Sequence, residues 1–544
     1  MKRIKILMPI LALAFFSCDD YLDINSPSPN DLAFEDVLPS KALPAAQLGA
    51  YRVQAGNMNQ LGNVFMNSWT RNVQSFGNGY DRELQLQIDN GFYTGIWDGT
   101  YRSLKNFDAI IKFPNPNGKF DYYVAAAKIC KAHYMQQIVD LYGDAPYSQA
   151  WAGSLNTTPA YDDDYSIYQG LIAELEDARD LITNADPSVA EDIATFDIML
   201  GGDMTRWNEF ANTIQLRMCL RMSAVTGAKA VFRDDKLDDI AAGPFLSDNV
   251  AINPGFSAAT NDNMNPEFNT FEYDAAGNLA QNRTFKTMTG HAYKALQSYA
   301  STNYPAAGSQ EIIAGSGVFY PNVTDPRSAR LFTAAPSNPR RAVTQGSSLV
   351  DVGLNTATFP GLPCRFGLGN YNAYGTTHAG ATIADYATTD GFVMTYSESC
   401  FLQAEAALRY PSLFSGGSTW FNAGIQDSMD MKFVAAGSYI ATINTKTNFG
   451  WTGTDAQKMH AIMYQKWVAL MGVNNSIQSY IDYTRTGYPL TPLSTNAVQT
   501  RKPYRLIYPV SEYVANTANV PAMSTSEIFA INSKTPFWVP GAPN

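Results

Sequence analysis

Four long stretches of the chain place apolar residues at steps of three and four, the pattern of amphipathic helices packed against a core. They are AKICKAHYMQQIVDLYGDAPY (127–147), DMTRWNEFANTIQLRMCLRMSAVTG (203–227), MTYSESCFLQAEAALRY (394–410) and TDAQKMHAIMYQKWVALMG (454–472). Gly143 with Pro146 predicts the end of the first helix. Asp203 or Thr205 is the expected N-cap of the second helix, and Gly227 its expected terminator. A mainly α-helical fold follows.

Between the second and third helices, from about residue 254 to 391, the composition shifts to Asn, Gly, Thr, Ala and Pro with scattered aromatics. Loop regions of this length are uncommon in compact domains and are often functional. By contrast, Trp97, Trp207 and Trp467 fall on apolar helical stripes, so we expect them in the core. No self-similarity at a fixed period is visible.

The N-terminus has the pattern of a secretory signal. Lys2, Arg3 and Lys5 precede an apolar run that is too short to span a membrane and ends at Ser17. Cys18 follows at once, and behind it comes the acidic, proline-rich DDYLDINSPSPND. The cysteine resembles the acylated residue of a bacterial lipobox, so we interpret residues 1–17 as a signal peptide and 18–40 as a lipidated tether. An ordinary secreted protein with an early thiol is the alternative.

Residues 41–544 can bury a large core, because the segment is long and because 45% of the whole chain is hydrophobic and only 16% is charged. The net charge of −11 argues against a nucleic-acid partner. Beyond Cys18 the cysteines are widely spaced and form no CxxC pair, which excludes zinc ribbons and redox motifs. Cys130, Cys219 and Cys400 lie in helical patterns and are expected as small core residues.

Recognisable catalytic motifs are missing from the sequence. It contains no HExxH, no Walker A loop and no GxSxG elbow, and its histidines are far apart: His133, His291, His378 and His460. Asp162, Asp163 and Asp164 could suggest a glycosidase acid pair, but they directly precede a helical pattern, where capping is favoured. We therefore expect no catalytic residue, no cofactor and no metal site.

A second acidic segment, NDNMNPEFNTFE, places Asn261, Asn263, Asn265 and Glu272 on a calcium-loop template. The first position lacks its aspartate and Pro266 replaces the required glycine, so the match is interpreted as accidental.

Two pairs of like charges lie on helices that otherwise look buried. Arg217 and Arg221 are one turn apart on one helix, and Glu398 and Glu405 are two turns apart on another. Because such charges need partners, we predict Arg-to-Glu pairs between these two helices, with Arg217–Glu405 as the pair to test.

Six sequence blocks resemble those of SusD/RagB-like outer-membrane lipoproteins of Bacteroidetes, and they follow one another in the family's order. The blocks are CDDYLDINSPSPND, IVDLYGDAPYSQA, RWNEFANTIQLRMCLRMS, YSESCFLQAEAALR, QKWVALMGVNNSIQSYIDYTRTGYP and YRLIYPVSEYVANTANV. The resemblance runs from Cys18 to near the C-terminus and is similar to the branch with WNEFAN and QKW stretches. It implies one large domain in which tetratricopeptide-like helix pairs support a loop-rich ligand face. It also implies a cell-surface, lipid-anchored lid over a SusC-like TonB-dependent transporter, and Asp19 and Asp20 are similar to surface-export signals.

Ligand residues are not shared motifs of that family, so candidates come from chemistry. A glycan site needs aromatic platforms beside planar polar groups. The early segment NSWTRNVQSFGNGYDR offers Trp69, Arg71, Asn72, Gln74 and Tyr80. The loop-rich region offers Tyr371, Asn372 and Tyr374, with Tyr273 and Tyr320 as further candidates. For Trp69 a role as core anchor is an equal alternative.

The function expected from these features is non-enzymatic capture of an oligomeric nutrient, with a glycan as the first choice and a peptide as the alternative cargo. A surface glycoside hydrolase or peptidase is the alternative from another class, but the sequence shows only capping acids and isolated histidines. A structural or adhesive lipoprotein without a small ligand is a third alternative.

Overall fold

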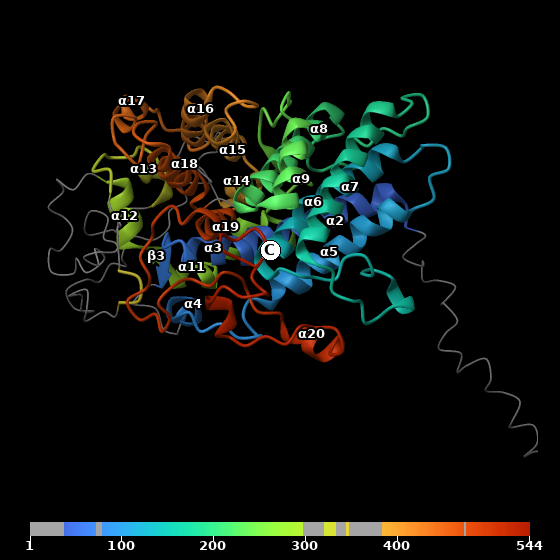
Figure 1. The fold of residues 1–544 in the computed structure, drawn as a ribbon, viewed down its shortest axis with the longest axis horizontal. Helices are drawn as coiled ribbons and strands as arrows, with labels where there is room; N and C mark the ends of the chain where they lie inside the picture. Colours follow the sequence, from blue (N-terminus) through green and yellow to red (C-terminus); the bar gives the residue numbers. More distant parts are fainter. Residues whose placement is uncertain are drawn as a thin grey trace, which may run out of the picture.

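The computed structural model describes residues 37–71, 79–297, 320–332, 344–347, 383–472 and 475–543. Helices dominate these residues, and the strands are only three or four residues long (Figure 1). The elements of the first half are α2 (Pro39–Val53), η2 (Gln54–Met58), α3 (Asn59–Phe65), β1 (Trp69–Arg71), α4 (Asp81–Gln85), α5 (Thr94–Lys112), α6 (Asp121–Tyr142), η3 (Gly153–Leu155), α7 (Asp164–Asn184), α8 (Met204–Arg221), η4 (Met222–Ala224), α9 (Gly227–Asp238) and β2 (Val250–Ile252).

The second half begins with short elements and returns to long helices. Its elements are η5 (Asn261–Asn263), α10 (Pro266–Phe271), α11 (Gln281–Phe285), β3 (Lys286–Met288), α12 (Gly290–Leu296), α13 (Ser328–Leu331), α14 (Ile383–Ala387), β4 (Gly391–Met394), α15 (Tyr396–Arg409), α16 (Gly417–Asp430), α17 (Tyr439–Ile443), α18 (Asp455–Leu470), α19 (Ile477–Thr486), α20 (Val510–Ala515) and η8 (Glu527–Phe529). The described part of the loop-rich region predicted at 254–391 therefore consists of short elements.

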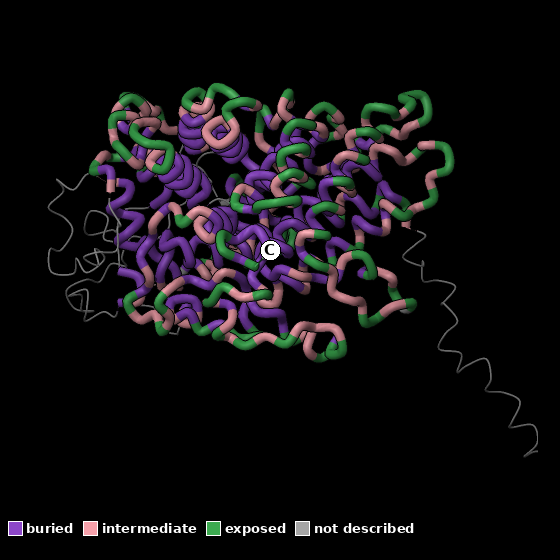
Figure 2. The backbone as a smooth tube through the Cα atoms, viewed as in Figure 1, coloured by how far each residue is buried: buried purple, intermediate pink, exposed green. Residues whose placement is uncertain are grey.

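The scaffold is built from helices that pack on their neighbours in sequence. α2 packs on α5, α5 on α6, α6 on α7 and α7 on α8, and a second group joins α15, α16 and α18. α8 and α15 connect the two groups. Figure 2 shows buried backbone along the inner helices and exposed backbone in the peripheral turns. The predicted mainly α fold of helix pairs in one large domain is confirmed. Among the described residues, no helix combines the length and apolarity that crossing a membrane requires.

The four predicted helices all form, as α6, α8, α15 and α18. Asp203 is the N-cap of α8, and its side chain accepts hydrogen bonds from the backbone N–H groups of Thr205 and Arg206. One boundary was wrong. Gly227 does not end this helix, because α8 stops at Arg221 and Gly227 opens α9 with a φ of 61°.

The predicted core residues are confirmed as well. Trp97, Trp207 and Trp467 are each at most 2% exposed. Cys130, Cys219 and Cys400 are buried free thiols. Burial raises the pKa of each thiol, so these cysteines behave as small apolar residues.

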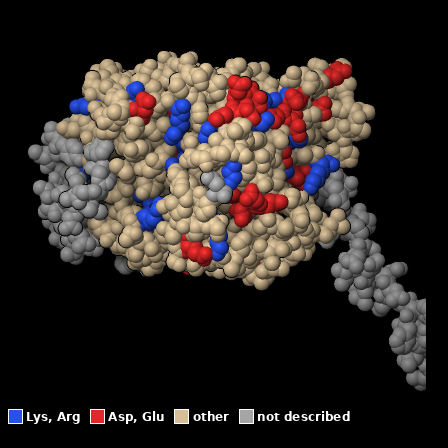
Figure 3. Space-filling model, in the orientation of Figure 1, with Lys and Arg blue, Asp and Glu red and all other residues tan. Residues whose placement is uncertain are grey.

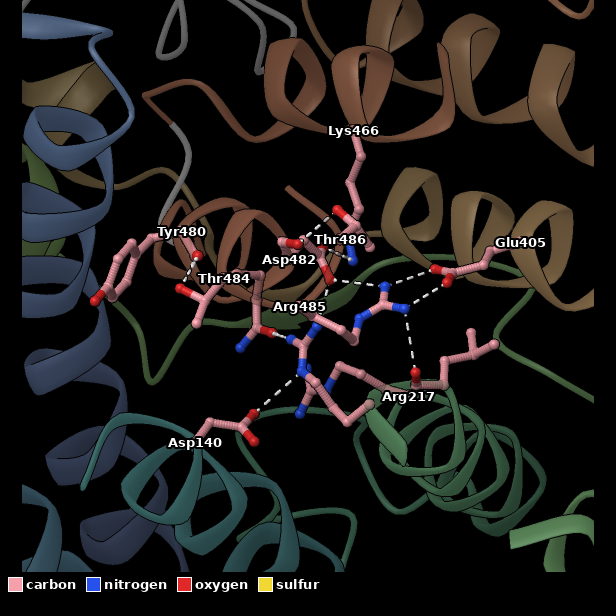
Figure 4. Close-up of polar contacts among 12 residues, drawn as sticks. Asp140, Arg217, Glu405, Lys466, Tyr480, Asp482, Thr484, Arg485 and Thr486 are labelled. Carbon is pink, nitrogen blue, oxygen red and sulfur yellow. Dashed lines mark hydrogen bonds and ion pairs between the residues drawn. The ribbon is translucent and has the colours of Figure 1, made fainter. Parts of the chain in front are cut away.

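A buried charge network joins the two helical groups, and Asp482 of α19 lies at its centre (Figure 4). Its carboxylate pairs with Arg221 of α8, with Lys466 of α18 at 2.8 Å and with Arg485 at 3.2 Å. Arg221 also reaches Asp140 of α6 at 3.3 Å. Burial alone would raise the pKa of Asp482, but the three cations outweigh burial and hold that pKa far below its usual range.

The predicted Arg-to-Glu pairing between α8 and α15 is only half correct. Arg217 does lie 3.5 Å from a carboxylate oxygen of Glu398. Glu405, however, pairs with Arg485 of α19 rather than with Arg217. The second arginine of α8, Arg221, turns to aspartates on α6 and α19 instead of a glutamate on α15. These partners lie far away in the sequence, so helical spacing could not identify them.

Candidate ligand face

Two short strands bring the early segment and the loop-rich region together. β1 pairs antiparallel with β3, with Arg71 opposite Lys286. Gly79 continues the contact, since a Cβ added there would lie only 3.1 Å from the Cβ of Phe285. We call β1, β3 and the adjoining residues 79–81, 271–285, 291 and 320 the candidate ligand face. It includes the five site candidates that the structure describes: Trp69, Arg71, Tyr80, Tyr273 and Tyr320.

A buried ion cluster underlies this face. Glu272 is fully buried and pairs with Arg283 and with Lys286, the latter at 3.3 Å. The ammonium of Lys286 also lies 4.6 Å from the ring centroids of both Trp69 and Phe271. Burial lowers the pKa of Lys286 to about 8 against the opposing pull of Glu272, and burial raises the pKa of Glu272. The cluster fixes the two strands through charge and aromatic contacts.

Sequence reasoning missed this cluster. Glu272 had been matched to the last position of a calcium-loop template, whereas its carboxylate is occupied by two cations. Asn265 of the same template caps α10, and Pro266 is the first residue of that helix. These contacts give Glu272 and Asn265 structural roles. A three-residue strand such as β3 is too short to show the alternation that would have revealed the pairing.

Within this face, Trp69 of β1 is a core residue. Its side chain has no exposed surface, and its ring meets Phe271 edge to face at 5.2 Å. Aromatic pairs of this geometry stabilise a core beyond their area of burial. The environment favours the anchor role that the sequence had weighed equally with ligand contact.

Arg71 and Tyr80 stand at the edge of the face. The guanidinium of Arg71 is held 2.5 Å from the carboxylate of Asp81, and both side chains stay partly exposed. Tyr80 precedes α4 with a left-handed φ of 63° and is 7% exposed. Burial, followed by the charge of Glu83, raises the pKa of the Tyr80 hydroxyl above its usual range. Tyr80 is thus neutral at physiological pH, and Arg71 is the more accessible of the two.

Tyr273 offers a partly exposed ring on the loop-rich side. The guanidinium of Arg283 lies 4.7 Å from the ring centroid. A β-bridge to Leu279 closes a small turn, and Leu279 itself is 43% exposed. Stacked arginine and exposed apolar surface beside a tyrosine suit the flat face of a sugar ring.

Tyr320 lies against α12. Its hydroxyl is 2.9 Å from Nδ1 of His291, a buried residue whose ring centroid lies 5.2 Å from that of Trp467. Burial, and after it the charges of Lys502 and Lys294, lowers the pKa of His291 to about 3, so the ring is neutral. His291 positions Tyr320 and was not expected at the site from sequence.

The remaining site candidates lie outside the described residues. They are Cys18, Asn72, Gln74, Tyr371, Asn372 and Tyr374. Their roles stay predictions.

The acids before α7 act as caps and as acceptors for backbone groups. Asp163 is the N-cap, and its side chain accepts from the backbone N–H of Ser166. Asp162 accepts from the backbone N–H of Tyr147, and Asp164 from that of Phe537, at 2.9 Å each. Asp163 and Asp164, with Asp144, also form the one acidic group among the described residues compact enough for a cation, with ligand atoms within 4.8 Å.

A family model described as "Starch-binding associating with outer membrane" matches residues 29–280 and 325–509. The chain belongs to the SusD-like family. The resemblance inferred from six sequence blocks is therefore confirmed. In the search of curated proteins, no sequence matches this SusD-like chain.

Solved structures share the SusD-like fold over nearly the whole chain. A chitin-binding SusD homologue from Flavobacterium johnsoniae has a TM-score of 0.65 at 21% identity, covering 92% of this chain and 99% of that one. A SusD homologue from Bacteroides thetaiotaomicron has a TM-score of 0.62 at 18% identity, covering 93% of this chain and 100% of that one. A structure named Bacteroidetes AC2a SusD-like has a TM-score of 0.67 at 18% identity, covering 92% of this chain and 100% of that one. The TM-scores show a common fold, and at these identities the comparisons show the fold alone.

Proposed function

We propose that this protein is a surface lipoprotein, anchored through Cys18, that captures a glycan oligomer and delivers it to a SusC-like TonB-dependent transporter. The observation that carries the proposal is the candidate ligand face in a chain of the SusD-like family. Arg71 lies in β1, Tyr273 contacts Arg283 of the cluster that also holds Lys286 of β3, and Tyr320 contacts His291 just after β3; all three are partly exposed. The family's starch-binding description and the chitin-binding relative support a glycan as cargo.

Binding at this face would use stacking and hydrogen bonds only. The guanidinium of Arg283 lies over one face of the Tyr273 ring, so a sugar would stack on the other face, and Arg71 offers N–H donors. On the side shown in Figure 3, acidic side chains gather over α7 to α9, whereas the surface near β3 and α11 carries one patch of Lys and Arg within mainly uncharged surface. A face of low charge suits an uncharged oligosaccharide, because binding it does not require stripping water from many ionised groups.

A non-enzymatic role is part of the proposal. The acids that could have formed a glycosidase pair accept hydrogen bonds from backbone N–H groups around α7. The histidines of the described residues are buried, and Nδ1 of each has a contact: His133 lies 3.1 Å from Arg217, His291 2.9 Å from Tyr320 and His460 2.6 Å from the carbonyl of Asn448. Those contacts are structural.

Isothermal titration of the soluble chain from Asp19 onward tests the cargo class. The panel is malto-oligosaccharides, chitin oligosaccharides and mixed peptides, each also titrated into the Tyr371→Ala/Tyr374→Ala double variant. Saccharide binding supports the proposal, and its loss in the double variant would extend the site to those tyrosines. Binding of peptides alone would replace glycan by peptide, and binding of nothing would favour a structural partner role.

The anchor and the transporter need their own measurements. Labelled palmitate should enter the wild-type precursor and not a Cys18→Ala precursor, and only the former should fractionate with the outer membrane. Pull-down of a TonB-dependent barrel by the lipidated protein from solubilised membranes supports the delivery step. Recovery of the lipoprotein alone under the same mild conditions would count against a stable lid.

A further inference from the structure

A second hollow lies away from the candidate ligand face, where β2 and β4 meet the start of α8 and the end of α16. Its volume is about 310 Å³, at the lower end of the range for small-molecule pockets. Met199, Phe392 and Met431 provide an apolar lining. The polar part of the lining is made by Arg206, Asp248, Asn249, Asp390 and Asp430, and Ala251 and Phe433 also line the hollow. We call this hollow the α8–α16 pocket.

Phe433 is an unusual residue for its position. It follows α16 with a left-handed φ of 48°, a conformation that a bulky side chain rarely adopts and that typically costs about 1–2 kcal/mol. Its ring is nevertheless 53% exposed. Backbone hydrogen bonds from Phe433 to Asp430 and from Val434 to Met429 hold the turn. The fold thus fixes an exposed aromatic ring beside the pocket.

Each carboxylate of the pocket accepts a hydrogen bond through only one of its two oxygens within the described residues. One oxygen of Asp248 accepts from the backbone N–H of Asn249. One oxygen of Asp390 accepts from the side chain of Asn253, and one of Asp430 from Gln426. Hydrogen-bonding capacity therefore remains on three carboxylates, and their combined charge favours a cation.

Arg206 provides an N–H donor without an acceptor within the described residues. Its Nη2 donates to the backbone carbonyl of Asn249 at 2.6 Å, whereas its buried Nε has no hydrogen-bond partner among the described residues. Asn249 is itself fixed, because its side-chain oxygen accepts from the backbone N–H of Tyr396 at 2.8 Å. A ligand in this pocket must therefore offer an acceptor as well as donors.

We propose that the α8–α16 pocket binds a single sugar ring bearing a free ammonium group, an amino sugar unit at one end of an oligosaccharide. The ring would stack on Phe433 while its ammonium faces Asp248, Asp390 and Asp430. A hydroxyl oxygen would accept from Nε of Arg206. A lysine side chain would satisfy the acids and the aromatic ring, but it offers no acceptor, and a phosphate would be repelled. The choice of a saccharide rests on the proposed capture function.

Methyl NMR of the soluble chain labelled at methionine methyl groups tests this pocket, because Met199 and Met431 line it. Met199→Leu and Met431→Leu variants assign the two signals. Titration with a glucosamine trimer should shift both signals, and maltotriose should shift them less at the same concentration. Trilysine shifting them while glucosamine trimer does not would overturn the proposal, as would no shift with any probe.

Phe433→Asn is the decisive variant, since asparagine tolerates the left-handed backbone while removing the ring. The dissociation constant of the glucosamine trimer should rise about tenfold, the size expected for losing a stacking contact that also faces a cation. Asp430→Asn should reduce the preference for glucosamine trimer over maltotriose. Val514→Ala, which trims an exposed residue outside the pocket lining, is the control.

The same spectra separate this proposal from the capture function. Tyr273→Ala belongs to the candidate ligand face and should leave the shifts at Met199 and Met431 unchanged. If Tyr273→Ala abolished them, the α8–α16 pocket would not be an independent site. If Phe433→Asn left the affinity unchanged, stacking in the pocket would be refuted even where glycan capture at the other face is intact.

Discussion

The guanidinium of Arg485 in α19 binds the carboxylate of Glu405 in α15 through both oxygens, with N–O distances of 2.5 and 2.8 Å. Both side chains are 1% exposed. Arg485 also donates to the backbone carbonyl of Leu220 in α8 at 3.1 Å. One side chain therefore ties together three helices, including α8 and α15, through which the two helical groups meet.

Breaking this pair should be costly. Glu405→Gln removes the two-point carboxylate partner of the buried Arg485 guanidinium and leaves it only Asp482 at 3.2 Å, so we expect the free energy of unfolding to fall by about 3–5 kcal/mol. Urea unfolding followed by circular dichroism measures the change. Arg485→Met combined with Glu405→Leu should recover part of it, because both buried members of the pair are removed, Asp482 keeps Arg221 and Lys466, and Arg409, which loses Glu405, is partly exposed.

A matched control is the exposed pair Lys458–Asp455 on α18, where the aspartate is 78% exposed. Asp455→Asn should change the free energy of unfolding by less than about 1 kcal/mol. Equal effects at Glu405 and Asp455 would contradict the central role assigned to the buried network.

The network also predicts how stability depends on pH. Burial opposes ionisation of Glu405, yet Arg485 and Arg409 lower its pKa, and the cations around Asp482 lower the pKa of that residue further. Because both folded pKa values lie below the unfolded ones, their contribution is present above roughly pH 5 and is lost as the pH falls. Asp482→Asn should therefore cost most stability at neutral pH, and the gap to wild type should narrow steadily towards pH 3. A constant gap across unfolding curves from pH 7 to 3 would contradict this assignment.

The helices could be predicted from sequence because their signal is local. The 3.6-residue period placed α6, α8, α15 and α18, and Asp203 marked a cap. Partners across the core could not be predicted in the same way. Glu405 finds Arg485, 80 residues further on, and nothing in the spacing of either helix distinguishes that partner from Arg217.

The chemistry of the candidate site stays a prediction from sequence, and only part of its geometry could be anticipated. Aromatic residues beside Arg and Asn drew attention to the early segment that contains β1, whereas the pairing of β1 with β3 came from the structure. The burial of each side chain could not be predicted from sequence, so Trp69 and Tyr273 were both ligand candidates although Trp69 is buried and Tyr273 is partly exposed. Glu272 and His291 were missed as positioning residues, because burial and neighbours give them those roles.

Trp69 should behave as a core residue in experiments. Trp69→Ala should lower the free energy of unfolding by about 3–5 kcal/mol, because it opens a large cavity next to Phe271 and Lys286. Trp69→Phe keeps an aromatic ring and should cost less. Titration of the folded Trp69→Phe variant should give wild-type affinity for the saccharide found to bind, whereas a loss of affinity without loss of stability would return Trp69 to the ligand site.

Replacing Asp163 should lower the stability of the fold and should not change the rate of glycan hydrolysis. Asp163→Ala removes the cap of α7 and should cost about 1 kcal/mol, while Asp163→Asn should retain most of the stability, since asparagine also caps helices. Both changes are measured by chemical denaturation. Release of reducing ends from starch or chitin oligomers should stay at background for wild type and both variants. Hydrolysis by wild type that Asp163→Asn abolishes would instead reveal a catalytic acid.

Tyr273 and Arg71 are the residues of the candidate ligand face whose replacement should weaken saccharide binding without unfolding the protein. Both are partly exposed, so Tyr273→Ala and Arg71→Ala should leave the free energy of unfolding within about 1 kcal/mol of wild type. Each should nevertheless weaken saccharide binding by roughly tenfold, because Tyr273 supplies a stacking surface and Arg71 charge-assisted donors. Isothermal titration measures the affinity. The controls are Tyr513→Ala in α20 and Arg233→Ala in α9, a tyrosine and an aspartate-paired arginine on other elements. If the controls weaken binding as much as the two site variants, the saccharide binds elsewhere on the molecule.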